Sequence, residues 1–151
     1  MTHVMATLVL ALIAVGGPHL ALAASDDVSA TTRAWIDAMN SRDPQKVVAL
    51  YDDDAVLWAT VSPVIRDTRQ AIREAFNFLR TVQEYKIVLG EQRVRVYGDM
   101  AINTGTYTVS AVPRDGKPVT LPARFSFVYR NRNGRWMIVD HHSSAMPAPP
   151  Q

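Results

Sequence analysis

Cysteine is absent from the 151-residue sequence. Its absence excludes disulfide bonds, thiolate metal ligands, a cysteine nucleophile and a lipoprotein anchor. An excess of charge is also lacking, because 16 Lys and Arg residues against 14 Asp and Glu residues leave a net charge of +2. Two surplus charges do not make a phosphate-binding surface, so we expect no nucleic-acid partner. The sequence contains 48% hydrophobic and 20% charged residues, which is typical of a folded protein, and its length corresponds to one domain.

The longest apolar run covers residues 4–15 and is too short to cross a bilayer. A Gly-Gly-Pro step ends the run, and residues 21–23 read Ala-Leu-Ala shortly before a polar segment. This arrangement is typical of a secretory signal peptide. We therefore predict a signal peptide over residues 1–23, a periplasmic or secreted protein, and no membrane anchor after cleavage. The alternative is a helix buried at the start of the fold.

Hydrophobic spacing predicts two helices in the first part of the domain. From Ser29 onward the pattern is helical, and Trp35 and Met39 share one face with their apolar neighbours. A second, short helix is predicted to begin at Asp43, which is a good N-cap, with Pro44 at the first helical position.

A third helix is predicted to begin after Thr68, another good N-cap. Its apolar residues follow the spacing i, i+3, i+4 and i+7 of a core-facing stripe, and they are Ile72, Ala75, Phe76 and Leu79. Residues 52–54 are three aspartates, which we interpret as a solvated turn because no glycine-centred spacing of metal ligands follows them. A short strand is expected over residues 55–59.

Four segments rich in β-branched and aromatic residues then follow with a period of two, at residues 85–97, 100–112, 121–130 and 135–142. Turn residues stand between them: Gly98-Asp99, Asp115-Gly116 and Asn133-Gly134. Three consecutive hairpins predict an antiparallel meander.

The order of the elements, helices first and strands after, indicates an α+β fold. We predict a cone-shaped, curved antiparallel sheet packed against the N-terminal helices, in a single domain over residues 24–147. The Pro-rich end, residues 148–151, is expected to fray. The concave side of such a sheet is the expected place of a ligand pocket.

Residues 133–147 resemble the last hairpin of the nuclear transport factor 2-like superfamily. Further support comes from the tryptophan of the first helix, the Asp-Pro step at 43–44, the Leu-Tyr-x-Asp-Asp-Ala segment at 50–55 and the strand at 123–130. More narrowly, the sequence resembles the association domain of calcium/calmodulin-dependent protein kinase II and the stand-alone bacterial proteins of the SnoaL-like and DUF4440 types. The resemblance covers most of residues 28–147.

The resemblance implies self-association through the sheets, into a dimer or a larger homo-oligomer, and a polar pocket lined by arginines. In this sequence Asn103, Phe127 and Ser143 occupy the positions of those arginines. We therefore do not expect the anionic-ligand pocket of the kinase. The chain has no kinase catalytic domain, so no calmodulin-linked regulation is implied.

The densest polar cluster on any predicted strand is Asp-His-His-Ser-Ser at residues 140–144. Alternation places Asp140, His142 and Ser144 on one face of the strand, and His141 and Ser143 on the other. Whichever face looks into the cone, it carries a histidine that could move a proton near neutral pH. The alternative is structural, with these side chains satisfying backbone groups or a subunit contact.

The candidate ligand-binding residues are Tyr51, Trp58, Asn103, Tyr107, Arg124, Phe127, Asp140, Ser143 and Ser144. Arg124 lies in an otherwise apolar strand, where it either faces solvent or anchors a ligand or a carboxylate. Tyr51 and Trp58 lie where such a cone is lined, or they pack in the core. We expect no metal site, because the two histidines left after cleavage are adjacent and point apart. We expect no cofactor, because no nucleotide-binding glycine motif is present.

Two functions are compatible with these features. The favoured one is an exported, non-catalytic module that binds an unidentified small, partly apolar molecule and self-associates. The alternative is a cofactor-free isomerase, dehydratase or cyclase with His141 or His142 as general acid or base. In that enzyme Tyr51, Asn103 or Tyr107 would polarise a carbonyl group.

Overall fold

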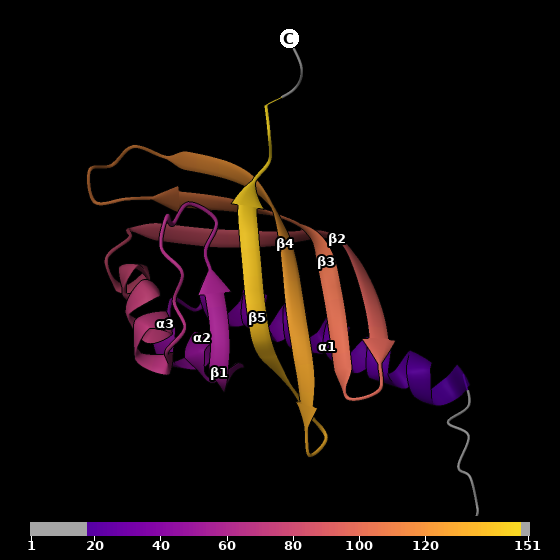
Figure 1. Ribbon diagram of the computed structural model, residues 1–151. Helices are drawn as coiled ribbons and strands as arrows, with labels where there is room; N and C mark the ends of the chain where they lie inside the picture. Colours follow the sequence, from indigo (N-terminus) through magenta and orange to yellow (C-terminus); the bar gives the residue numbers. More distant parts are fainter. Residues whose placement is uncertain (1–17, 149–151) are drawn as a thin grey trace, which may run out of the picture.

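The computed structural model describes residues 18–148. Its elements in chain order are α1 (Pro18–Asn40), α2 (Pro44–Val48), β1 (Tyr51–Trp58), α3 (Arg69–Ala75), the 3₁₀ helix η1 (Asn77–Arg80), β2 (Glu84–Tyr97), β3 (Met100–Val112), β4 (Val119–Arg132) and β5 (Arg135–Ala145). This order confirms the predicted α+β fold, with the helices ahead of the long strands (Figure 1).

Helix α1 is longer than the sequence pattern predicted, because it begins at Pro18 instead of near Ser29. Near its start Leu22 is 69% exposed, Ala24 is partly buried against the core, and the first fully buried residue described is Val28. Of the expected signal peptide, residues 1–17 lie outside the described residues. None of the helices described between residues 18 and 148 is long and apolar enough to cross a membrane.

The two short helices begin at the caps that the sequence predicted. The Asp43 carboxylate accepts a hydrogen bond from the backbone N–H of Gln45 at 2.9 Å, and the Thr68 hydroxyl accepts one from Ala71 at 3.2 Å. Helix α3 is shorter than the predicted stripe. The 3₁₀ helix η1 continues the chain over the core, which keeps Leu79 buried.

The five strands form one open sheet in the order β1-β5-β4-β3-β2. Strands β2 to β5 pair in antiparallel fashion, which confirms the meander, whereas β1 lies at the edge and runs parallel to β5. The tight turns contain residues with positive φ, namely Gly98 (65°), Asn133 (55°) and Gly134 (88°), as hairpin turns of this length require. Figure 1 shows α1 running along one side of a bent sheet, and none of the helices described between residues 18 and 148 lies on the other side.

Two glycines, Gly90 of β2 and Gly105 of β3, lie where the register between these strands is irregular. The register of β2 is irregular around Gly90, and a Cβ atom on this glycine would collide with the hydroxyl of Thr106. A Cβ atom on Gly105 would collide with the backbone oxygen of Glu91 and press on the ring of Phe125. Residues without side chains therefore permit the close approach that curves the sheet over the helices.

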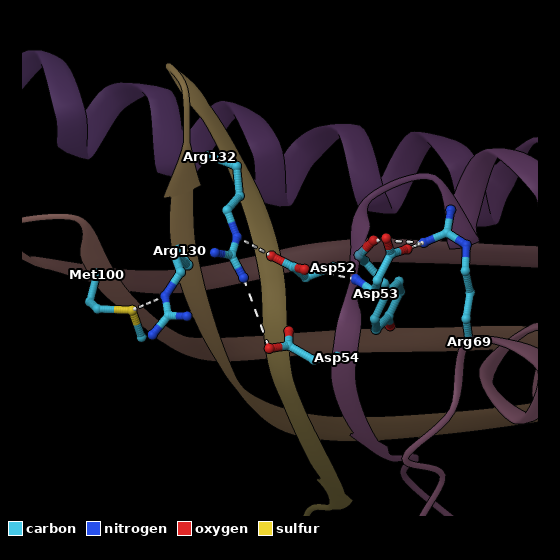
Figure 2. A network of polar contacts seen from close by, with 8 residues as sticks. Asp52, Asp53, Asp54, Arg69, Met100, Arg130 and Arg132 are labelled. Atoms are coloured by element: carbon cyan, nitrogen blue, oxygen red, sulfur yellow. Dashed lines mark hydrogen bonds and ion pairs between the residues drawn. The ribbon is translucent and has the colours of Figure 1, made fainter.

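The predicted turn at residues 52–54 is wrong, because all three aspartates belong to strand β1. Ion pairs to distant elements accompany the extended conformation (Figure 2). The pairs are Arg132 with Asp52 at 2.7 Å, Arg132 with Asp54 at 3.9 Å, and Arg69 with Asp53 at 2.9 Å. The aspartates are thus held by β4 and α3, and no turn is needed to satisfy them.

Candidate functional site

The alternation of β5 decides which polar residues face the helices. His141 and Ser143 are buried on the face covered by helices, which we call the inner face. Asp140, His142 and Ser144 point to the opposite, outer face. The sequence left both orientations open, and the structure selects His141 for the inner face.

A cavity of about 450 Å³ lies on the inner face, which places the expected concavity within the fold. This inner cavity is bounded by the sheet, by the loop at residues 59–66, and by α1, α3 and η1. Most of its lining is aliphatic or aromatic, and its polar side chains are Thr60, Ser62, Arg66, Tyr85, Tyr107, His141 and Ser143. Sites for small organic molecules typically measure roughly 300–1,000 Å³ and have a similar lining.

One hydrogen-bond chain orients the imidazole of His141. The indole N–H of Trp35 donates to the hydroxyl oxygen of Tyr51 at 3.1 Å, and that hydroxyl lies 2.7 Å from Nδ1 of His141. Burial raises the pKa of Tyr51 well above its ordinary value, against the opposing effect of the Trp35 bond, so the hydroxyl keeps its proton. Since the indole only donates, this proton is directed at Nδ1. The proton of the neutral imidazole is therefore on Nε2.

Burial, assisted by the nearby charge of His142, lowers the pKa of His141 to about 3. The ring is neutral at physiological pH and packs against Phe127 and Trp35, with ring centroids 4.1 Å and 5.2 Å away. Its Nε2 atom is buried and has no hydrogen-bond partner among residues 18–148. A buried donor without a partner costs about 1–3 kcal/mol.

Three hydroxyl groups form a second polar cluster in the lining of the inner cavity. The Thr60 hydroxyl lies 2.9 Å from that of Tyr107 and 2.8 Å from that of Ser143. Burial raises the pKa of Tyr107, although its contacts with Ser143 and Thr60 oppose the increase. Tyr107 and Ser143 are predicted site residues that the structure brings together, and Thr60 was not predicted.

Asn103 is buried, but it connects α1 to the sheet and does not line the cavity. Its amide nitrogen donates to the hydroxyl of Thr32 at 2.7 Å and to Oε1 of Gln92 at 2.8 Å. The Tyr129 hydroxyl lies 2.8 Å from the same Thr32 oxygen. Burial raises the pKa of Tyr129, which keeps this donor protonated. The Asn103 cluster therefore holds α1 against β3 and β4.

Two other predicted residues are also buried without lining the inner cavity. Tyr51 and Phe127 have no exposed surface, and both contact the imidazole of His141. Their contribution to the site is to position this ring. The three positions at which the resemblance implied arginines thus carry an amide (Asn103), a phenyl ring (Phe127) and a hydroxyl (Ser143), all of them buried.

The remaining predicted residues lie on the outer face. The ring of Trp58 is 6.0 Å from that of His142, and the Arg124 guanidinium donates to the hydroxyl of Ser144 at 3.1 Å. Partial burial raises the pKa of Asp140, and the nearby His142 opposes the increase. The structure therefore separates these residues from His141, and they do not line the inner cavity.

Sequence reasoning missed the loop at residues 59–66. Its Arg66 pairs with Leu57 through two backbone hydrogen bonds, of 2.8 Å and 2.9 Å, and both side chains line the cavity. The loop has no periodic pattern that could have indicated this position. Within residues 18–148, no three His, Cys, Asp or Glu side chains are grouped in a way that could hold a metal ion.

The long bent sheet, its helical cover and the cavity between them define a nuclear transport factor 2-like protein. Residues 24–147 match the family described as the calcium/calmodulin dependent protein kinase II association domain. The chain belongs to this family.

Solved structures agree with this assignment. A candidate association domain of this kind from Xanthomonas campestris is 36% identical, covers 95% of this chain and 99% of its own, and superposes with a TM-score of 0.73. A candidate dehydratase of the nuclear transport factor 2-like family from Streptomyces avermitilis is 19% identical over 85% of this chain and 99% of its own, with a TM-score of 0.75. A superfamily member from Salmonella enterica is 20% identical over 86% of this chain and 95% of its own, also with a TM-score of 0.75. A comparison with curated proteins gives no match.

Proposed function

We propose that the protein is a non-catalytic module that holds a small, mostly apolar molecule in the inner cavity and associates with further copies of itself. The buried Nε2–H of His141, which has no partner within the described fold, carries the first part of the proposal. A ligand oxygen that accepts a hydrogen bond from this group would remove the cost of leaving it unpaired.

The surroundings of His141 favour a ligand with few polar atoms. The hydroxyls of Thr60, Tyr107 and Ser143 already contact one another, so they can exchange partners with a ligand oxygen without leaving a group unpaired. The rest of the lining is mainly hydrocarbon, which favours an apolar ligand body. The matching ligand class is an apolar molecule that carries a carbonyl, ester or carboxyl oxygen.

The enzymatic alternative is less well supported by the same geometry. Nδ1 of His141 is occupied by Tyr51, and a pKa of about 3 makes the ring a weak base near neutral pH. His142 lies on the outer face, away from the inner cavity. The likeness to a candidate dehydratase supports the shared fold alone.

The binding proposal is tested by thermal unfolding in the presence of a panel of apolar ketones, esters and carboxylates. A ligand present at about one hundred times its Kd stabilises the fold by about 2.7 kcal/mol, which raises Tm by several degrees. Ala111→Phe fills the cavity without removing a polar group and should abolish the shift. Ala145→Phe is the control, because Ala145 is exposed outside the cavity lining. The proposal fails if no member of the panel raises Tm.

The outer face supports the second part of the proposal, self-association. One row across the strands reads Arg95, Ile102, Val128 and Asp140, so that two apolar residues lie between opposite charges. If two copies face each other through this surface, a twofold axis between them at the centre of the row would place Arg95 of each copy over Asp140 of the other. The row is therefore complementary to itself.

Sedimentation measures this association directly. The parent protein should sediment as a dimer or a larger species, and Val128→Glu should shift it toward the monomer by placing a carboxylate at the centre of the row. Ala34→Glu adds the same charge at an exposed position of α1 and should leave the assembly unchanged. A monomeric parent protein would overturn the proposed association.

Export is a further part of the proposal. Leu22, just ahead of the expected cleavage site, is 69% exposed, and Ala24 is the first described residue that packs against the core, so cleavage after Ala23 would leave the described core residues in the mature chain. Mass spectrometry of the protein recovered from the producing cell should find a chain that begins at Ala24. Recovery of only the full-length chain from the cytoplasm would contradict export.

A further inference from the structure

We propose that the ligand of the inner cavity is an apolar carboxylate that enters with its apolar end first and is held at the mouth by Arg66. This inference rests on the binding function proposed above and specifies the charge and orientation of the ligand. Among the described residues that line the cavity, Arg66 is the one charged side chain, and no carboxylate accompanies it.

Backbone pairing places Arg66 in line with the inner end of the cavity. Leu57 is the partner of His141 across β1 and β5, and Arg66 is the partner of Leu57 across the isolated bridge that follows. Directly paired residues point to the same face of a sheet, so Arg66 and His141 lie on the inner face with Leu57 between them. At about 4.8 Å for each strand spacing, their backbones lie about 10 Å apart.

The loop that carries Arg66 is exposed to solvent, whereas His141, which lies beyond Leu57 from Arg66, is buried. Val61, in the same loop, is 77% exposed and contributes to the cavity lining. Phe78 and Val119 also line the cavity and are 41% and 49% exposed. His141 and Ser143 are each 3% exposed. The cation therefore lies at the mouth and the neutral polar groups lie inside.

The guanidinium of Arg66 is anchored on one side only. Its Nη1 atom donates to the hydroxyl of Ser62 at 2.8 Å and to the backbone oxygen of Val64 at 3.0 Å. Its Nη2 and Nε atoms have no hydrogen-bond or ion-pair partner within residues 18–148. A planar guanidinium with two free donor nitrogens matches a carboxylate in geometry and charge.

The chemistry of the two ends fixes the orientation. A carboxylate placed against His141 would be buried with neutral donors and no cation, and an unpaired buried charge is costly. At Arg66 the same group is paired and remains close to water. The apolar body then occupies the hydrocarbon lining, with its far end toward His141 and Ser143.

The test compares decanoate, methyl decanoate and decyltrimethylammonium by isothermal titration calorimetry on the parent protein. These probes share an apolar chain and differ in the charge of the head group. Decanoate should bind at least about tenfold more tightly than its ester, the size expected for a charge-assisted hydrogen bond, and the cation should bind most weakly. Equal binding of decanoate and its ester would overturn the inference but leave the binding function in place.

Variants separate the charge of Arg66 from its support of the loop. Arg66→Gln should remove the preference for decanoate over its ester, and Arg66→Lys should restore part of it. Arg73→Gln removes an exposed arginine of α3 that does not line the cavity, and it should behave like the parent. An unchanged preference in Arg66→Gln would overturn the role of Arg66. If neither decanoate, its ester nor any member of the earlier panel binds, the binding function itself fails.

Discussion

The hydroxyl of Tyr51 lies 2.7 Å from Nδ1 of His141, although the two residues are 90 positions apart in the chain. The parallel pairing of β1 with β5 brings them together on the inner face. The contact fixes the tautomer of the imidazole, because the indole of Trp35 supplies the other bond to the same hydroxyl oxygen. Tyr51, which does not line the inner cavity, thus determines which nitrogen of His141 carries the proton.

Tyr51→Phe should destabilise the fold by about 1–3 kcal/mol, because it leaves the indole N–H of Trp35 and Nδ1 of His141 without their partner. Chemical denaturation measures this loss. Tyr97→Phe is the matched control, since Tyr97 is 59% exposed, and it should change the free energy of unfolding by less than about 0.5 kcal/mol. Nitrogen NMR shifts of His141 should also show a loss of the pure Nε2–H tautomer. Unchanged shifts would contradict the role given to Tyr51.

His141 should make the stability of the protein depend on pH in the acid range. The folded state keeps the ring neutral down to a pKa of about 3, whereas the unfolded chain binds a proton below about pH 6.5. The free energy of unfolding therefore decreases as pH falls below about 6.5, by up to about 1.4 kcal/mol per pH unit.

His141→Gln should flatten this dependence between about pH 6.5 and 5, a range in which most carboxylates do not yet titrate. Denaturation at a series of pH values supplies the measurement. His142→Gln, on the outer face, should retain the slope of the parent. An equal slope in the parent and His141→Gln would show that His141 binds a proton as readily in the folded state as in the unfolded chain, which contradicts its lowered pKa.

Gly105→Ala should destabilise the protein by about 3 kcal/mol, because the added methyl group meets the backbone of Glu91 and the ring of Phe125. The backbone cannot yield as a flexible side chain could. Ser110→Ala, at an exposed position of the same strand, should cost less than about 0.5 kcal/mol. Urea denaturation compares the two variants. A parent-like Gly105→Ala variant would mean that the bend of the sheet does not depend on this glycine.

Arg132→Gln should raise the pKa of Asp52. The hydrogen bond from Arg132 is the main reason that this pKa lies below its ordinary value, and backbone and charge contributions are smaller. A depressed carboxyl pKa contributes stability above the unfolded value and loses it as pH falls through the folded one, so the variant should be less sensitive to acid. Carbon NMR titration of the carboxyl group measures the shift. Arg69→Gln, which removes the partner of Asp53, should leave Asp52 unchanged.

Features of the fold that depend on neighbouring residues were predictable from the sequence. The caps at Asp43 and Thr68 and the turn at Asn133-Gly134 follow from local chemistry, and the structure confirms them. The aspartates at residues 52–54 were misjudged because the partner of Asp52 is Arg132, 80 positions away. Nothing in the local sequence indicates that pairing, so a turn was the natural reading of three adjacent carboxylates.

The candidate site was predictable only in part, for the same reason. The alternation of side chains along a strand predicted which residues share each face of β5. Only the packing of the helices decides that His141 points inward. The positions of Thr60 and Arg66 depend on how the loop at residues 59–66 folds back onto Leu57. Trp58 and Arg124 were grouped with the pocket because residue type alone does not tell the two faces of a sheet apart.

The adjacent histidines of β5 have a consequence for folding. A slip of one residue between β5 and β4 would exchange the surroundings of the two imidazoles and carry the carboxylate of Asp140 into hydrocarbon, where an unpaired charge is not tolerated. Only one alignment leaves that carboxylate in water and gives the Tyr51 hydroxyl an imidazole to meet. The segment at residues 140–144 thus specifies the register in which β5 pairs with β4, because the offset pairing is energetically disfavoured.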